Sequence, residues 1–402
     1  MTHLEPPLAG KLAGLTSSVI RDLLKLTADP NILSLAGGLP DAELMPGARI
    51  AAAAESALRG SAALQYTESP GWGPLREVLA GREADRLGRR VDIAEIFVTH
   101  GSQQALSLLA EVLLDPGALV VVEDPAYVGA IQVFRAAGAR IVAVPLDNEG
   151  LRVDRLAELL AAGEHPALVH TVSNFHNPGG VTMSPRRRQA LAALAEEHGF
   201  WVIEDDPYGE LWFDRPAPAP VASYSSTIIR LSSASKIIAP TLRVGWMVAP
   251  QRVCRAVELL KQGADLCGSA LTQQIAAELL ADSDWLTGHI DTVRGVYATR
   301  ATALVDAARD QFGDRLRCTE ASGGMFVWAE FTDGTDTGEL LPRALETGVA
   351  FVPGGAFAVS NPYANAMRMC FTTAAPEMLA EAMARLARAA AGDRAPVHSA
   401  QL

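Results

Sequence analysis

The chain has 402 residues, of which 49% are hydrophobic and 20% charged, a composition typical of a globular protein and of neither a disordered nor a fibrous one. Its 34 Lys and Arg against 46 Asp and Glu give a net charge of −12 without a basic stripe, so we expect a small-molecule partner and neither nucleic acid nor a membrane. Four dispersed cysteines suit neither a metal site nor a disulfide framework, and no run reaches the roughly 18 apolar residues that span a bilayer, so we predict a metal-free cytoplasmic protein.

Short apolar runs alternate with helical patterns over the first two thirds of the chain. The predicted strands cover residues 96–99, 119–123, 140–144, 167–172, 201–204, 228–231 and 245–249. Between them, segments such as 103–114 and 186–198 repeat apolar residues at the i, i+3, i+4 and i+7 spacing of amphipathic helices. This alternation predicts an α/β fold with a mainly parallel sheet that helices cover on both faces.

The pattern changes after residue 265. A helical tract over 266–311 is followed by a strand at 323–328, a helix at 338–346, a strand at 349–352 and a closing helix. We expect three parts: an N-terminal segment over 1–45, with a helix at 18–26, that packs with the small domain; a large domain over 46–265; and a small α+β domain over 266–402.

Polar residues follow the predicted strands, where ligands bind in open α/β sheets. After the first strand, residues 100–103 (HGSQ) open a helix whose free N–H groups suit a phosphate, although Ser102 as an ordinary N-cap is an alternative. A turn at 173–180 (SNFHNPGG) follows the fourth strand, and 205–208 (DDPY) follows the fifth. A plain loop and helix-capping carboxylates are the alternatives for these two segments.

Two cations occupy apolar sequence contexts. Lys236 lies between a serine and two isoleucines in the segment 231–245 (LSSASKIIAPTLRVG). An apolar setting disfavours the charged form of lysine and makes it a candidate for Schiff-base chemistry, whereas a surface lysine with a buried stem is the alternative. Arg368, within a strand-like run, needs a buried anionic partner, which is either a substrate or a structural ion-pair partner.

In this order, the motifs resemble those of the fold-type-I pyridoxal-phosphate enzymes, specifically the class I/II aminotransferases. Further segments are similar to the 2-aminoadipate and kynurenine/aminoadipate aminotransferase branch: 20–26 (IRDLLKL), 35–40 (LAGGLP), 64–66 (LQY), 123–127 (EDPAY), 261–266 (KQGADL) and 323–328 (GGMFVW). The same domain also occurs behind a winged-helix DNA-binding domain in bacterial regulators. Because the resemblance runs from about residue 15 to residue 390, we expect no such domain here.

The resemblance implies an aspartate-aminotransferase-like large domain with a mainly parallel seven-stranded sheet, and pyridoxal 5'-phosphate as the cofactor. It implies an enzyme that moves an amino group between an L-amino acid and a 2-oxo acid, with glutamate and 2-oxoglutarate as one pair. By the same resemblance Lys236 holds the cofactor and moves the α-proton, and Asp205 pairs with the ring nitrogen. Tyr208 and Asn177 hydrogen-bond the ring oxygen.

The remaining cofactor contacts are also implied by the resemblance. The residues assigned to the phosphate are Ser102 and Gln103 through their backbone N–H groups, Ser233 and Ser235 through their hydroxyls, and Arg243 through its guanidinium. Tyr127 stacks on the ring, and Tyr66 reaches the phosphate of the neighbouring subunit. A homodimer with shared active sites follows from this last assignment.

Arg368 is assigned to the substrate α-carboxylate, with Gly38 and Asn177 beside it. Arg21, on the N-terminal helix, either receives a distal carboxylate of the substrate or lies on a solvated helix face.

The segment 173–180 departs from the family pattern. Ser173, Asn174 and His176 replace the usual proline and glutamine, and the usual Asn-Pro-Thr-Gly reads Asn-Pro-Gly-Gly. His176 is interpreted either as a structural histidine or as a determinant of specificity. The departure also leaves an alternative reaction open: elimination, condensation or oxidation of a specialised amino acid by an enzyme of the same fold.

Overall fold

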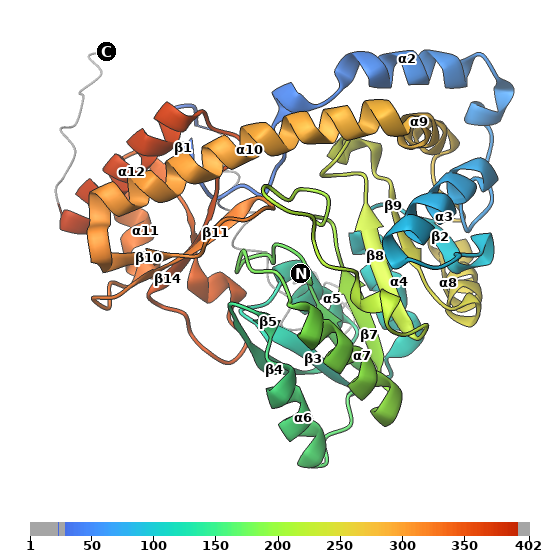
Figure 1. Cartoon of the computed structure of the whole chain (residues 1–402), viewed down its shortest axis with the longest axis horizontal. Helices are drawn as coiled ribbons and strands as arrows, with labels where there is room; N and C mark the ends of the chain where they lie inside the picture. The colour runs from blue at the N-terminus through green and yellow to red at the C-terminus, as the bar shows by residue number, and fades with distance from the viewer. Residues whose placement is uncertain (1–22, 24–28, 393–402) are drawn as a thin grey trace, which may run out of the picture.

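The computed structural model describes residues 23 and 29–392, and an eight-stranded sheet forms its centre (Figure 1). In spatial order the strands are β2 (Ile96–Thr99), β9 (Gly245–Val248), β8 (Ile228–Ser233), β7 (Trp201–Asp205), β6 (Leu168–Thr171), β3 (Leu119–Asp124), β4 (Arg140–Asp147) and β5 (Gly150–Leu151). Strands β3, β4, β6, β7 and β8 run parallel, whereas β9 is antiparallel to both of its neighbours and β5 to β4. The predicted mainly parallel α/β sheet is confirmed, and the two-residue β5 extends it at one edge.

Helices cover both faces of this sheet. Two helices come before the first strand of the sheet along the chain, α2 (Gly47–Leu58) and α3 (Gly73–Leu87). The helices that follow that strand are α4 (Ser102–Leu113), α5 (Val128–Ala136), α6 (Val153–Ala161), α7 (Pro185–His198) and α8 (Gln251–Ala264). On β3, Val120 and Val122 pack with residues of α4, α5 and α8, whereas Val121 belongs to the cluster that contains residues of α3, α6 and α7. Because successive side chains of a strand point to opposite faces, the strands read as continuous apolar runs.

A second, four-stranded antiparallel sheet is built from the C-terminal part of the chain. Its order is β10 (Leu316–Cys318), β11 (Phe326–Phe331), β14 (Ala366–Cys370) and β13 (Val352–Pro353). The helices of this part are α9 (Ala270–Ala281), α10 (Ser283–Phe312), α11 (Thr337–Glu346) and α12 (Pro376–Ala391). The strand β1 (Leu33–Ser34) pairs with β12 (Val349–Ala350), so the first described strand packs with the C-terminal part of the chain.

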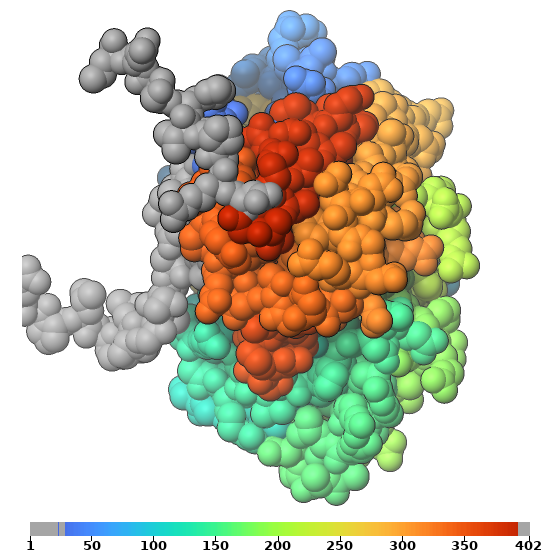
Figure 2. All heavy atoms as spheres, turned by 90° about the vertical axis from the view of Figure 1, so that its left-hand side faces the viewer, coloured from blue at the N-terminus to red at the C-terminus, as the bar shows by residue number. Residues whose placement is uncertain are grey.

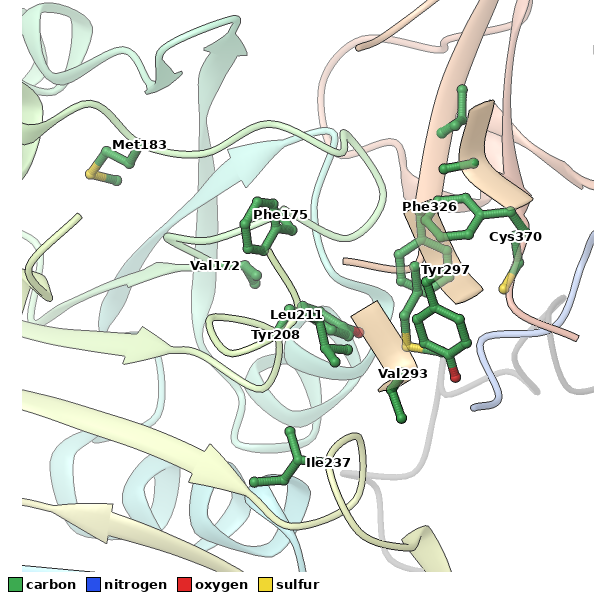
Figure 3. Packing of buried hydrophobic residues seen from close by; sticks show 14 of the residues in the cluster. Val172, Phe175, Met183, Tyr208, Leu211, Ile237, Val293, Tyr297, Phe326 and Cys370 are labelled. Atoms are coloured by element: carbon green, nitrogen blue, oxygen red, sulfur yellow. The ribbon is translucent and has the colours of Figure 1, made fainter. Parts of the chain in front are cut away.

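The helix α10 connects the two regions of the molecule. It runs from the side of α9, near α2 and α3, to the side of α12 (Figure 1), and in the space-filling view the orange and red C-terminal residues form one block against the green central residues (Figure 2). One hydrophobic cluster extends between the regions: Phe175 and Tyr208 lie on one side, and Phe326 and Tyr297 on the other (Figure 3). Among the described helices, none is both long and apolar enough to cross a membrane.

Short 3-10 turns complete the described backbone. They are η2 (Ala42–Leu44), η3 (Ser61–Leu64), η4 (Ile93–Glu95), η5 (Val221–Ser223), η6 (Pro240–Leu242), η7 (Gly313–Arg315) and η8 (Gly354–Phe357).

Four predicted elements differ from the structure or lie outside it. The strand expected over 349–352 is two short strands in different sheets, because β12 pairs with β1 and β13 pairs with β14. The helical tract expected over 266–311 is two helices, because Asp282 leaves the helical conformation at ψ 80° and its side chain accepts a hydrogen bond from the Trp285 N–H. The strand expected from residue 323 begins at Phe326, because Gly323 makes an isolated bridge to Trp212 and Gly324 bends the chain at φ +72°. Both glycines lie against Phe175, where an added Cβ would approach that side chain to 2.4–2.5 Å. Apart from Leu23, the helix expected at 18–26 lies outside the described residues.

The break at Asp282 can be tested by two substitutions. Asp282 caps α10 and also forms an exposed ion pair with Arg49. Removing a cap costs about 1 kcal/mol, whereas an exposed ion pair contributes at most about 1 kcal/mol and often nothing measurable. We expect Asp282→Ala to lower the free energy of unfolding in urea by about 1 kcal/mol, and Asp282→Asn, which keeps the acceptor oxygen, to lower it much less. Equal losses would show that the cap does not stabilise the break.

Candidate active site

The predicted motifs meet at a cavity of about 600 Å³ at the carboxyl ends of the parallel strands. All but two of the predicted site residues line it: Gly38, Ser102, Gln103, Tyr127, Asn177, Asp205, Tyr208, Ser233, Ser235, Lys236, Arg243 and Arg368. Tyr66 lies outside this cavity with 78% of its surface exposed, and Arg21 is outside the described residues. The fold therefore gathers residues that are up to 330 positions apart, counting from Gly38 to Arg368 (368 − 38 = 330).

One wall of the cavity is the turn that opens α4. Gly101 is the N-cap residue, at φ +75°, so the alternative of Ser102 as the N-cap is wrong. The turn lies directly against β9, because a Cβ on Gly245 would approach backbone atoms of Gly101 and Ser102 to 2.5–2.7 Å. The first N–H groups of α4 lack helical partners and, together with the helix dipole, favour an anion at this place.

Hydroxyls and a guanidinium complete this wall. The Ser233 hydroxyl donates to Ser235 Oγ at 2.8 Å, and Arg243 donates from Nη2 to the His100 carbonyl at 2.8 Å. Arg243 has a left-handed backbone (φ +52°), and its exposed guanidinium lies beside Gly101. A helix N-terminus, two hydroxyls and a guanidinium form a donor set that suits a phosphate group.

Lys236 lies deep in the cavity. Its Nζ donates a hydrogen bond to the Gly38 carbonyl at 2.9 Å. Burial is the main cause that lowers the pKa of the amine to about 8; the charges of Arg368 and Arg243 act in the same direction, and Cys370 opposes them. Near neutral pH a substantial fraction of this amine is therefore uncharged and nucleophilic, which a surface lysine is not.

Asp205 presents a carboxylate that the described residues only partly satisfy. The residue is 2% exposed, Oδ1 has no hydrogen-bond partner in the described part of the chain, and Oδ2 lies 3.8 Å from His170 Nε2. A buried acceptor without a partner is costly unless a bound group donates to it, so this carboxylate suits a protonated ring nitrogen. Two phenols lie nearby: burial raises the pKa of Tyr127 to about 12 and also raises that of Tyr208, so both are O–H donors at neutral pH.

Arg368 is a buried cation on β14. Its two hydrogen bonds go to neutral oxygens, from Nη1 to Asn177 Oδ1 at 2.9 Å and from Nη2 to the Ala36 carbonyl at 2.6 Å. Its Nε has no partner, and none of the ion pairs among the described residues includes it. Its guanidinium lies 4.3 Å from the Phe326 ring centroid. The alternative of a structural ion pair thus has no support in the described chain, and an incoming carboxylate would compensate the charge.

Several residues of this region are not among the predicted site residues. Phe326 and Gln132 line the cavity, and His170 lies beneath Asp205. Phe326 belongs to a segment that the resemblance had singled out, although without a role. His170 had no local signal, because its proximity to Asp205 arises from the register of β6 and β7, which pairs His170 with Ile203.

His176 lies outside the cavity, and both of its ring nitrogens have a polar neighbour, although only Nδ1 forms a hydrogen bond within the described residues. Nε2 is 2.9 Å from Glu123 Oε2, and Nδ1 accepts a hydrogen bond from the Gly179 N–H at 3.0 Å. The residue is fully buried. The interpretation of His176 as a structural histidine agrees with these contacts, and nothing in them brings its ring to the cavity.

Comparisons with known proteins agree with this arrangement. The family model "Aminotransferase class I and II" matches residues 30–386. An aromatic-amino-acid aminotransferase 1 of Thermococcus litoralis is 38% identical over 385 residues, which are 94% of this chain and 92% of that protein. A 2-aminoadipate transaminase of Thermus thermophilus is 41% identical over 393 residues, 95% of this chain and 96% of that protein. The solved structure of LysN, the alpha-aminoadipate aminotransferase of Thermus thermophilus complexed with N-(5'-phosphopyridoxyl)-L-leucine, superposes with a TM-score of 0.87 at 37% identity, covering 96% of this chain and 97% of that chain.

The lowered pKa of Lys236 has a measurable consequence in the cofactor-free protein. Only the neutral amine reacts with an acylating reagent, so labelling of Lys236 should rise with pH through a midpoint near 8, against about 10.5 for an ordinary lysine. Peptide mass spectrometry after brief acylation would give the midpoint, and the same peptide in urea is the control, because unfolding restores the solvation of the amine. A midpoint above 10 in the folded protein would contradict the assignment.

Proposed function

The chain belongs to the class I and II aminotransferases, and from this membership we propose the role of each residue in the cavity. The protein is a pyridoxal-phosphate-dependent enzyme that moves an amino group between an amino acid and a 2-oxo acid. The observation that carries the proposal is one cavity with three groups that are incompletely partnered among the described residues: the half-buried amine of Lys236, the buried carboxylate of Asp205 and the buried guanidinium of Arg368.

The residues present suit the cofactor. The α4 N-terminus, the hydroxyls of Ser233 and Ser235 and the guanidinium of Arg243 would bind its phosphate. Oδ1 of Asp205, which has no partner among the described residues, would accept a hydrogen bond from the ring N–H and keep the ring protonated. Tyr208 and Asn177 would donate hydrogen bonds to the ring oxygen, and Tyr127 would pack on the ring face.

Lys236 is the base in this proposal. Bound pyridoxal phosphate supplies an electron sink for the pair of electrons that remains when the α-proton of the substrate is removed. The Lys236 amine, once displaced by the substrate amine, takes up that proton at Nζ and returns it to another position. A pKa near 8 suits both steps, because the amine is able to gain and lose a proton close to neutral pH.

Arg368 would bind the substrate α-carboxylate, with the Gly38 backbone beside it. A charged pair of this kind is bidentate and oriented, and it leaves the substrate side chain free to vary. We propose glutamate and 2-oxoglutarate as one substrate pair. Arg21, as a partner for a distal carboxylate, remains a prediction for a residue outside the described chain.

We also propose a homodimer in which Tyr66 reaches the phosphate site of the neighbouring subunit. In its own subunit Tyr66 does not line the cavity and is 78% exposed, and Leu64 beside it is 74% exposed. Large exposed apolar side chains so close together favour an interface. A cytoplasmic location is part of the proposal as well, and the four unpaired cysteines support it because reducing compartments keep thiols free.

The reaction is tested by adding single amino acids to the purified holoenzyme. Conversion of the cofactor to its amino form, followed by absorbance, should occur without an oxo acid and should reverse when 2-oxoglutarate is added. Lys236→Ala should abolish the conversion while the cofactor remains bound without a covalent bond, and Asp205→Ala should slow it severely because the ring would lose its proton. Repeated turnover of one amino acid without an acceptor would contradict transamination.

Sharing of the active site is tested by mixing two inactive or weakened variants. Lys236→Ala lacks the base in every site of its dimer, and Tyr66→Phe lacks the phenol that we place at the partner's phosphate. In a mixed dimer one site combines Lys236 of one subunit with Tyr66 of the other. The activity of the co-refolded mixture should therefore exceed that of either variant alone. A mixture no more active than the two separate variants added together would refute a shared site.

A further inference from the structure

We propose that Glu123 and His176 are positioning residues that hold Asn177 in the active site through a connected set of polar contacts: the close approach of the two side chains and the hydrogen bonds that each makes to the backbone. Neither residue lines the cavity, and neither has a role in the function proposed above. The inference rests on that function, because the side chain that they would position, Asn177, contacts both Arg368 and Tyr208.

The connection begins at a buried carboxylate at the end of β3. Glu123 is 2% exposed, and Oε1 accepts a hydrogen bond from the Thr171 hydroxyl at 2.6 Å. Oε2 accepts from the Val172 N–H at 3.0 Å and lies 2.9 Å from His176 Nε2. Although burial raises the pKa of the Glu123 carboxyl, these contacts outweigh it and hold the pKa below its ordinary value. Glu123 is therefore an ionised, fixed acceptor that joins β3 to the end of β6.

His176 connects Glu123 to the loop that carries Asn177. The Gly179 N–H donates to Nδ1, and the other ring nitrogen, Nε2, faces Glu123. The backbone of His176 closes the same turn: its N–H donates to the Val181 carbonyl at 2.8 Å, and its carbonyl accepts from the Gly180 N–H at 2.7 Å. The imidazole thus fixes the turn on both sides of Asn177.

The sequence departures at 176 and 179 fit each other. A Cβ on Gly179 would lie 3.1 Å from His176 Nδ1 and 2.7 Å from Leu146 Cδ2, so the threonine usual in the family pattern would crowd the imidazole. Glycine at this position leaves room for the ring and keeps the N–H that donates to it. The two unusual residues therefore act as a pair, and the altered segment needs no altered chemistry to explain it.

The consequence lies in the cavity, at the other end of the same turn. Asn177 Oδ1 accepts from Arg368 Nη1 at 2.9 Å and so determines where the guanidinium is held. Arg368 has few other constraints, the Ala36 carbonyl at Nη2 and the neighbouring Phe326 ring among them. A displaced Asn177 would leave the guanidinium less well aligned for a substrate carboxylate, and alignment is what makes a bidentate pair strong.

Four amide variants test the proposal in the holoenzyme. Glu123→Gln removes the anionic acceptor, His176→Gln keeps a donor toward Glu123 but no acceptor for Gly179, and His176→Asn keeps that acceptor but no donor. The matched control is Glu83→Gln, another buried carboxylate, which accepts hydrogen bonds from Arg230 and Trp246 and lies outside the cavity. All four variants remove one buried charge or one polar contact.

Two measurements separate positioning from simple stability. For the amino acid half-reaction, the three variants at 123 and 176 should raise KM about tenfold or more with a much smaller change in kcat, because a bound carboxylate interacts alike in ground and transition states. Amide hydrogen exchange of segment 173–183 should quicken in the same three variants. Glu83→Gln should lower Tm but change neither quantity. In Glu123→Gln/His176→Asn, the KM increase should match the larger of the two single increases, because both changes break one connection.

The outcomes distinguish a failure of this proposal from a failure of the proposed aminotransferase function. Suppose that the wild type transaminates and that the variants at 123 and 176 have the same KM and the same amide exchange rates over 173–183 as Glu83→Gln. Positioning by Glu123 and His176 is then refuted, and the aminotransferase assignment stands. If the wild type converts no amino acid, the proposed function fails, and hydrogen exchange still decides whether the two residues order the turn. Should Glu123→Gln fail to fold, the two His176 variants give the same decision.

Discussion

A single buried guanidinium joins the three parts of the chain that enclose the cavity. Arg368 belongs to the four-stranded sheet, Asn177 to a loop of the eight-stranded sheet and Ala36 to the N-terminal segment, and the guanidinium hydrogen-bonds to both of the other two. A charge cannot be left in an apolar interior without polar contacts, so its burial requires these neighbours to stay in place. No carboxylate among the described residues compensates the positive charge itself, and this leaves the cavity suited to a carboxylate.

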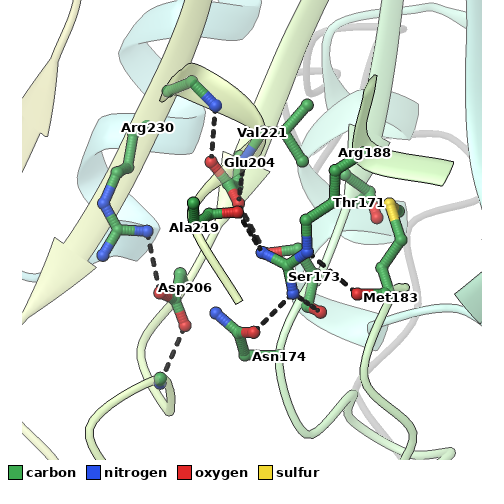
Figure 4. A network of polar contacts seen from close by, with 12 residues as sticks. Thr171, Ser173, Asn174, Met183, Arg188, Glu204, Asp206, Ala219, Val221 and Arg230 are labelled. Atoms are coloured by element: carbon green, nitrogen blue, oxygen red, sulfur yellow. Dashed lines mark hydrogen bonds and ion pairs between the residues drawn. The ribbon is translucent and has the colours of Figure 1, made fainter. Parts of the chain in front are cut away.

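Two other buried arginines of the described chain have carboxylate partners, and this contrast marks the cavity. Arg230 contacts Asp206 at 2.7 Å and Glu83 at 2.9 Å. Arg188 hydrogen-bonds to Asn174 Oδ1 and to the Ser173 and Met183 carbonyls, and lies 3.5 Å from Glu204 (Figure 4). These contacts fix the start of the loop that carries Asn177. A preorganised binding site requires binding groups without partners of their own, held in place by neighbouring residues whose charges and hydrogen bonds are already paired.

Much of the fold and of the site could be predicted from the sequence because both depend on local signals. Parallel strands buried on two faces must be continuously apolar, so the seven main strands were evident, and the fold class followed from their alternation with helices. Lys236 and Arg368 stood out because charges are rare in apolar runs. The order of the motifs identified the family before any distance was known, and all but two of the predicted site residues line one cavity.

Tertiary structure decided which partner each polar group has, because contacts across strands and loops depend on register and packing that no local pattern encodes. His170 lies beside Asp205 only through the pairing of β6 with β7. The break at Asp282 depends on a capping hydrogen bond within an otherwise helical pattern, and the start of β11 depends on the bridge from Gly323 to Trp212 and the bend at Gly324. The sequence by itself determined the family, the cofactor and the chemical types at the site. Only the folded chain determined that Glu123 and His176 meet, and that Arg368 has no anionic partner among the described residues.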